Sequence, residues 1–291
     1  MPVPFAGMAW PEGHNCVTSL ISGIAFRDLH CGPFATPSGG TENAIKRAAR
    51  QRQNGHKSLK LIIFDCDGTL VDSQHMICAA MRQAYEAHGL SVPERERLLA
   101  IVGLSLPDAF RRLAQGGHAP HDPPVASLVA HYRTAFAALR QSVEHLEPLY
   151  PGAKEALDRL AERPDAVLGI ATGKSQRGVR AVLALHGLAE RFVTIQTADD
   201  APSKPHPGMV LAAMGATGIA AGDTVVVGDT VFDVEMARAA GARAIAVGWG
   251  YHRADDLMRA GADALIGDFS ELAGALDRLW AVAPPTARVA R

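Results

Sequence analysis

The sequence predicts an α/β protein in which a Rossmann-like parallel sheet forms the core and an α-helical cap domain is inserted after the first strand. From residue 59 onward, apolar runs of strand length alternate with segments of helical periodicity, a pattern typical of a parallel sheet covered by helices on both faces. Residues 73–147, which lie between the first apolar run and the return to the sheet, number about 75, whereas a crossover needs only about a dozen residues. The excess predicts an insertion.

Each expected strand is a short, nearly continuous apolar run, as strands buried on both faces of a sheet usually are. The runs are LKLIIF (59–64), AVLGIAT (166–172), RFVTIQT (191–197), TVVVGD (224–229), RAIAVG (243–248) and ADALIG (262–267). Parallel sheets place ligands at the carboxyl ends of their strands. We therefore expect functional side chains among the residues that follow each run.

The insertion has helical rather than strand patterning. Its expected helices lie in SQHMICAAMRQAYEAHG (73–89), PERERLLAIVG (93–103), LPDAFRRLAQ (106–115) and PVASLVAHYRTAFAALRQ (124–141). Ser73 is expected to cap the first of these helices, and PLYPG (148–152) marks the return to the sheet. We therefore predict a core of residues 58–72 and 148–291 and a helical cap of residues 73–147.

Residues 1–57 differ from the rest of the chain in composition and in the absence of a periodic pattern. Pro, Gly, Ser and Thr are scattered without periodicity, and a short basic patch ends the segment. We expect a disordered N-terminal extension. The basic patch has no interleaved aromatic residues, so we interpret it as a solvated segment rather than a nucleic-acid contact.

Composition excludes several classes of function. A formal net charge of -1 and a pI near 6.9 give no bulk attraction to nucleic acid or to an anionic membrane. The four cysteines lack metal-ligand spacing and do not suggest a disulfide framework, which indicates a reducing, cytoplasmic location. No apolar run reaches the roughly 18 residues of a membrane span, and we expect no secretory signal. The oligomeric state stays open, with a homodimer as the arrangement to test.

Polar residues follow four of the expected strands. Asp65 and Asp67 follow the first, Thr172, Gly173 and Lys174 the second, Lys204 the third after a short loop, and Asp229 and Asp233 the fourth. This set resembles the haloacid dehalogenase superfamily of hydrolases, specifically the helical-cap branch (subfamily IA) that contains phosphoglycolate phosphatase-like enzymes. The resemblance covers roughly residues 59–282.

The resemblance implies a phosphatase acting on a small phosphorylated metabolite through an aspartyl-phosphate, and it implies a role for each residue. Asp65 would be the nucleophile and a metal ligand. Asp67 would act as acid and base, with its backbone carbonyl on the metal. Thr172 and Gly173 would hold phosphate oxygens, and Lys204 would balance the charge of Asp65 and the phosphate. Asp229 would ligate the metal directly, and Asp233 would complete the metal site through water or by orienting its neighbours.

Electrostatics supports the same interpretation from the residues themselves. Carboxylates gathered at neighbouring strand ends repel one another unless a cation lies among them, and Mg²⁺ prefers oxygen ligands. An acid at position 67 also favours a phosphate ester over a haloacid, because departing halide needs no proton whereas an alkoxide does.

Other interpretations stay open at this point. A phosphomutase or phosphotransferase would use the same intermediate, and a non-catalytic module could bind a phosphate ester without turnover. Taken singly, Asp65 and Asp67 could form a polar turn, and Asp229 could cap a helix. A nucleotide-binding P-loop is disfavoured, because only three residues separate Gly169 from Gly173 in GIATGKS, where four are needed.

Overall fold

The computed structural model describes residues 58–115, 124–141 and 147–282, and all of them belong to one compact unit. They form a six-stranded parallel sheet with the order β3-β2-β1-β4-β5-β6. The strands are β1 (Lys60–Phe64), β2 (Ala166–Thr172), β3 (Thr194–Thr197), β4 (Thr224–Gly228), β5 (Arg243–Val247) and β6 (Ala264–Ile266). The predicted α/β class and all six predicted strands are confirmed. The predicted extension of residues 1–57 lies outside the described part of the chain.

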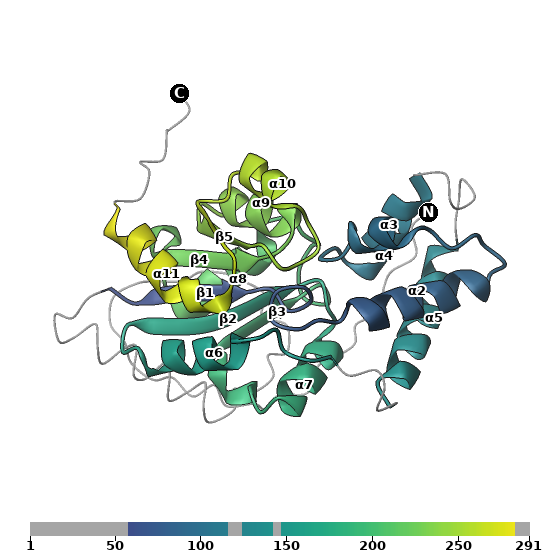
Figure 1. Cartoon of the computed structure of the whole chain (residues 1–291), viewed down its shortest axis with the longest axis horizontal. Helices are drawn as coiled ribbons and strands as arrows, with labels where there is room; N and C mark the ends of the chain where they lie inside the picture. The colour runs from purple at the N-terminus through teal and green to yellow at the C-terminus, as the bar shows by residue number, and fades with distance from the viewer. Residues whose placement is uncertain (1–57, 116–123, 142–146, 283–291) are drawn as a thin grey trace, which may run out of the picture. The chain divides into compact units, whose positions relative to one another are not determined.

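Alternation along β1 places apolar side chains on both faces of the sheet. Ile62 and Phe64 join a core with α6, α7 and α11, whereas Leu61 and Ile63 join a second core with α8, α9 and α10. Figure 1 shows α6 and α7 on one side of the sheet and α9 and α10 on the other. The covering helices are α6 (Ala153–Glu162), α7 (Gln176–Leu185), α8 (Gly208–Thr217), α9 (Val231–Ala239), α10 (Ala254–Ala260) and α11 (Leu272–Ala281).

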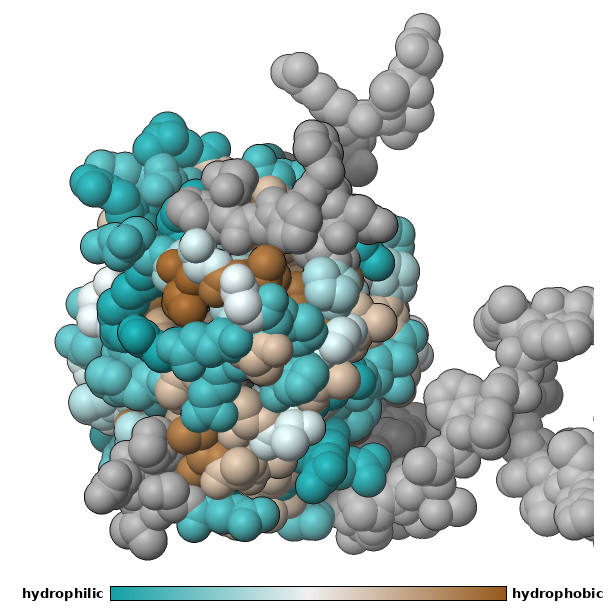
Figure 2. Space-filling view, turned by 90° about the vertical axis from the view of Figure 1, so that its right-hand side faces the viewer, coloured by the Kyte–Doolittle hydropathy of each residue, from teal (hydrophilic) through white to brown (hydrophobic). Residues whose placement is uncertain are grey.

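Helices follow β1 where the insertion was predicted. They are α2 (Gln74–Glu86), α3 (Arg95–Leu99), α4 (Leu106–Leu113) and α5 (Val125–Leu139). These helices share a hydrophobic core of their own, in which Tyr85 and Phe110 are fully buried. Hydrophilic residues cover much of the face of the molecule on this side, and hydrophobic residues gather there only in small patches (Figure 2). The exact cap boundaries stay a prediction.

The two segments that join these helices to the sheet lie side by side. Val71 pairs with Leu149 in an antiparallel bridge. The amide of Asp72 donates a hydrogen bond to the carbonyl of Pro148, and the amide of Tyr150 donates one to the carbonyl of Leu70. The entry to and exit from the helical insertion are therefore tied together next to the end of β1.

The order of the strands creates a switch point at β1. From β1 the sheet continues through β2 and β3 on one side and through β4, β5 and β6 on the other. Ligands of open α/β sheets bind at the carboxyl ends of the strands at such a point. Asp65 follows β1 and Asp229 follows β4, so both residues lie there. Among the described helices, none is both long and apolar enough to span a membrane.

Candidate active site

Three carboxylates meet at the carboxyl ends of β1 and β4. Asp65, Asp229 and Asp233 each offer an oxygen, and the three oxygens lie within 4.8 Å of one another. All three residues are buried, with at most 1% of their surface exposed. The positions of these residues after expected strands predicted that they would lie at one edge of the sheet, and the geometry places them together.

Lys204 lies among the same carboxylates. Its ammonium nitrogen is 2.9 Å from Asp65 Oδ1 and 2.6 Å from Asp233 Oδ1, and the residue is 1% exposed. Burial alone would lower the pKa of Lys204, but Asp233 and Asp65 outweigh that effect and hold the pKa above its ordinary value. A permanent positive charge therefore contacts Asp65, as the sequence predicted.

Asp65 remains incompletely satisfied. Its Oδ1 forms the ion pair with Lys204, and the Thr172 hydroxyl lies close enough to lower the pKa of Asp65, but neither carboxylate oxygen accepts a hydrogen bond of good geometry from the described residues. Burial, opposed by Lys204 and reinforced by Asp233, raises the pKa of Asp65 to about 6. Buried polar atoms without partners are rare and call for an explanation. A divalent cation would supply a missing partner for these oxygens, so this donor set fits Mg²⁺.

Neighbouring groups fix Asp229 in place. Its Oδ1 accepts a hydrogen bond from the Thr69 hydroxyl and its Oδ2 from the Tyr251 amide, both at 2.9 Å. Burial, followed by the charges of Asp233 and Asp65, raises its pKa well above the ordinary value. Gly68 has a φ of 85°, and a Cβ there would lie 2.3 Å from Asp229 Oδ2. Only glycine allows the backbone to approach Asp229 so closely.

Asp229 does not cap the helix that follows it, so that alternative is wrong. Thr230 is the N-cap of α9, and Asp233 completes a capping box with it. The Oδ2 of Asp233 accepts hydrogen bonds from the backbone amide and the hydroxyl of Thr230, at 3.1 and 2.6 Å. Its Oδ1 contacts Lys204. The first turn of α9 thus sets the orientation of Asp233 toward the site.

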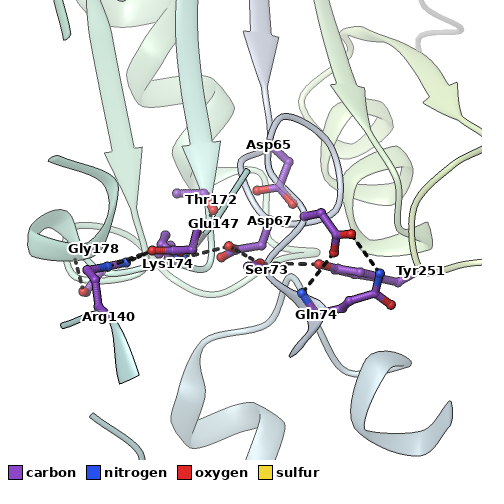
Figure 3. A network of polar contacts seen from close by, with 12 residues as sticks. Asp65, Asp67, Ser73, Gln74, Arg140, Glu147, Thr172, Lys174, Gly178 and Tyr251 are labelled. Carbon is purple, nitrogen blue, oxygen red and sulfur yellow. Dashed lines mark hydrogen bonds and ion pairs between the residues drawn. The ribbon is translucent and has the colours of Figure 1, made fainter. Parts of the chain in front are cut away.

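Asp67 is separate from the three-carboxylate cluster. Its Oδ1 accepts hydrogen bonds from the Ser73 hydroxyl at 2.6 Å and from the Lys174 ammonium at 2.8 Å. Figure 3 shows Asp67 between these two partners. Ser73 was expected to cap α2, and it does occupy the N-cap position, but its side chain makes no cap hydrogen bond. The carboxylate of Asp67 competes successfully for its hydroxyl.

Thr172 and Gly173 line a cavity of about 500 Å³ together with Asp65 and Asp67. Thr172 ends β2 and is 1% exposed. A Cβ at Gly173 would lie 2.5 Å from the carbonyl oxygen of Gly103 and 2.6 Å from that of Leu104. Glycine at this position therefore lets the loop between α3 and α4 approach the carboxyl end of β2.

Sequence reasoning missed a chain of buried charges that begins at Asp67. Lys174 contacts both Asp67 and Glu147 at 2.8 Å, and Glu147 also forms an ion pair with Arg140 at the end of α5. Figure 3 shows this network. Burial alone would lower the pKa of Lys174, but the charges of Asp67 and Glu147 raise it overall. The only available signal was the position of Lys174 directly after Thr172 and Gly173.

Replacement of Lys174 by methionine is expected to destabilise the fold. Asp67 and Glu147, 12% and 1% exposed at the side chain, would lose their shared cation, and breaking a buried pair in this way costs about 3–5 kcal/mol. Urea unfolding measures the loss. The matched control is Lys154→Met, because Lys154 is half exposed in its pair with Asp158 and should cost less than about 1 kcal/mol. Equal losses in the two variants would contradict this account of the network.

The raised pKa of Asp65 predicts a pH-dependent stability in metal-free buffer. Below about pH 4 the carboxyl is protonated in both the folded and the unfolded chain and has no effect. Between about pH 4 and pH 6 the unfolded chain loses this proton first, because its pKa is near 3.8 and the folded value is about 6. Asp65 therefore destabilises the fold increasingly across this window, by up to about 3 kcal/mol.

Asp65→Asn isolates this effect, because the amide cannot ionise. We expect its unfolding temperature to exceed that of the unsubstituted protein by a margin that grows from about pH 4 to pH 6 and then stays constant. Thermal unfolding of both proteins at several pH values measures the margin. A margin independent of pH would show that Asp65 titrates in the fold as it does in the unfolded chain.

Comparison with known proteins gives consistent similarities. A family described as haloacid dehalogenase-like hydrolase matches residues 62–247. A probable phosphatase, IndB, of Dickeya dadantii is 36% identical over 222 residues, which are 75% of this chain and 94% of that protein. A phosphoglycolate phosphatase of Chromobacterium violaceum is 33% identical over 218 residues, 74% of this chain and 96% of that protein. The crystal structure of a hydrolase from Pseudomonas syringae superposes with a TM-score of 0.66 at 27% identity, covering 76% of this chain and 99% of that one.

Proposed function

Because the chain belongs to the haloacid dehalogenase-like hydrolases and is a phosphatase of phosphate monoesters, we propose that it works through an aspartyl-phosphate on Asp65 and requires Mg²⁺. The observation that carries this proposal is the buried cluster of Asp65, Asp229 and Asp233, in which no hydrogen bond of good geometry from the described residues reaches the Asp65 oxygens. Phosphoglycolate is the first substrate to test, since several relatives bear the name phosphoglycolate phosphatase.

In the proposed reaction an Asp65 oxygen attacks phosphorus and the bond to the leaving oxygen breaks. Asp67 donates a proton to that oxygen, so the alcohol departs neutral. Asp67 then accepts a proton from water, which attacks the aspartyl-phosphate and releases inorganic phosphate with Asp65 restored. The hydrogen bonds that Ser73 and Lys174 donate to Asp67 hold its carboxyl group in one orientation for both steps.

The remaining residues bind charge. Lys204 contacts Asp65 and would stabilise the negative charge of the transferring group, and Thr172 and the amide of Gly173 would donate hydrogen bonds to phosphate oxygens. Asp65, Asp229, Asp233 and the backbone carbonyl of Asp67 would hold Mg²⁺. When bound, the ion would neutralise part of the charge of the carboxylates and of the phosphate.

Release of inorganic phosphate from a panel of small monoesters, with and without Mg²⁺, tests the proposal. We expect hydrolysis in Mg²⁺ and a loss of about 10²–10³-fold or more after the metal is removed with a chelator, because the metal carries a large share of the charge stabilisation. Restoration by added Mg²⁺ is the control for damage by the chelator. Equal turnover with and without metal would contradict the metal requirement.

A further inference from the structure

The cavity beside the candidate active site is larger than a two-carbon phosphate ester needs. Its volume is about 500 Å³, within the roughly 300–1,000 Å³ of pockets for drug-sized ligands. Phosphoglycolate has about nine non-hydrogen atoms, and even at the roughly 30 Å³ that one water occupies in the liquid they would fill about half of this volume. The cavity therefore has room for a substantially larger leaving group.

Apolar side chains from the helical insertion line much of the cavity. Ile77 and Met81 on α2, Leu104 in the loop before α4, and Tyr132 and Phe136 on α5 line this part of the cavity. The rings of Tyr132 and Phe136 pack together with centroids 5.7 Å apart. Such a wall favours an apolar group of the ligand, because water leaves both surfaces when they meet.

Two positively charged side chains that line the cavity, Lys174 and Arg140, already form ion pairs with carboxylates of the protein. Lys174 contacts two carboxylates, and Arg140 pairs with one of these, Glu147. The carboxylate of phosphoglycolate would lie one carbon from the ester oxygen, close to Asp67. Near Asp67 it would meet the ammonium of Lys174, which already contacts two carboxylates. Arg133, which also lines the cavity, is exposed and lies 3.9 Å from Asp199. Arg177, which has no ion pair with the described residues, is exposed on α7.

Tyr132 adds one polar group to the apolar wall. The residue is 8% exposed, and its hydroxyl has no hydrogen-bond partner among the described residues. Burial raises the pKa of Tyr132, so the hydroxyl stays protonated and can donate or accept one hydrogen bond. Ligand pockets commonly combine mostly apolar walls with a few such polar groups.

We propose that the substrate is a phosphate monoester whose leaving group is an apolar body larger than glycolate, packed against Tyr132 and Phe136. This inference rests on the proposed function, because it concerns the leaving group of the same reaction. Three features distinguish this site from one that suits phosphoglycolate: the larger volume of the cavity, its apolar lining, and the pairing of the buried Lys174 with carboxylates of the protein.

Steady-state kinetics with two primary alkyl phosphates tests the inference. The pair is 2-phenylethyl phosphate and phosphoglycolate, with butyl phosphate as an intermediate case. We expect kcat/KM in Mg²⁺ to be at least about tenfold higher for 2-phenylethyl phosphate than for phosphoglycolate, because the phenyl ring buries apolar surface that glycolate lacks.

Two variants locate the preference in the wall. Phe136→Leu keeps an apolar side chain of lower volume and should reduce the ratio of the two kcat/KM values several-fold, since the aromatic contact is lost. The matched control is Phe192→Leu: Phe192 packs against Phe64 in the core and does not line the cavity. It should leave the ratio unchanged.

The outcomes separate this inference from the proposed function. A higher kcat/KM for phosphoglycolate, or an equal fall in the ratio for both variants, would overturn the inference while phosphatase activity stands. Absence of Mg²⁺-dependent hydrolysis of any of the three esters would overturn the proposed function, and the inference with it.

Discussion

Replacement of Asp65 by asparagine is expected to reduce phosphatase turnover by several orders of magnitude, on the order of 10⁴-fold or more. The amide has nearly the shape of the carboxylate but cannot attack phosphorus, so the covalent route disappears. Release of phosphate from p-nitrophenyl phosphate in saturating Mg²⁺ measures the loss, because this ester makes slow turnover easy to detect.

Loss of activity must be separated from loss of fold. Asp65 is buried beside Asp229 and Asp233, so removal of one of three repelling charges should leave the fold intact and, above about pH 6, more stable in metal-free buffer. Circular dichroism and thermal unfolding provide that control. A folded Asp65→Asn protein with turnover within tenfold of the unsubstituted enzyme would contradict the assignment of the nucleophile.

Lys204→Met is expected to impair both stability and activity. The substitution leaves Asp65 and Asp233 buried without the ammonium that lies 2.9 and 2.6 Å from them. Removal of one partner from a buried ion pair costs about 3–5 kcal/mol, and loss of a positive charge at the transferring phosphate lowers turnover by about 10²–10³-fold. Urea unfolding and phosphate release measure the two effects.

Added Mg²⁺ provides the control for this variant. If the cluster holds the ion, Mg²⁺ should stabilise Lys204→Met, because the metal replaces part of the missing positive charge. It should not restore turnover, since the charge that Lys204 supplies to the phosphate is still missing. Wild-type stability of the variant in metal-free buffer would contradict the role of Lys204 in balancing the buried carboxylates.

The fold was predictable because its signals are local. Strands buried on both faces of a parallel sheet are continuous apolar runs, and the six runs chosen from the sequence are the six strands observed. Asp65 and Asp229 could be placed together because parallel strands end at one edge of the sheet. Strand order, which makes β1 and β4 neighbours, was supplied by the structure.

The charge network around Asp67 was not predictable in the same way. Lys174 and Glu147 are 27 positions apart in the chain, and no periodicity relates a loop after β2 to the segment that follows α5. The partner of the Ser73 hydroxyl was unpredictable for a related reason. The side chain of a serine before a helix ordinarily accepts a hydrogen bond from the first turn of the helix. Here the Ser73 hydroxyl donates to the Asp67 carboxylate instead, and the position of Ser73 in the sequence does not reveal this acceptor.

Chemical trapping of the covalent intermediate tests the central claim most directly. Acyl phosphates are reduced by borohydride, so quenching the enzyme during turnover with Mg²⁺ and a phosphate ester should convert residue 65 to homoserine, as detected by peptide mass spectrometry. Homoserine at position 65, dependent on substrate and lacking in Asp65→Asn, is the predicted result. Full turnover with Asp65 unmodified in the quenched enzyme, or homoserine at another aspartate, would contradict it.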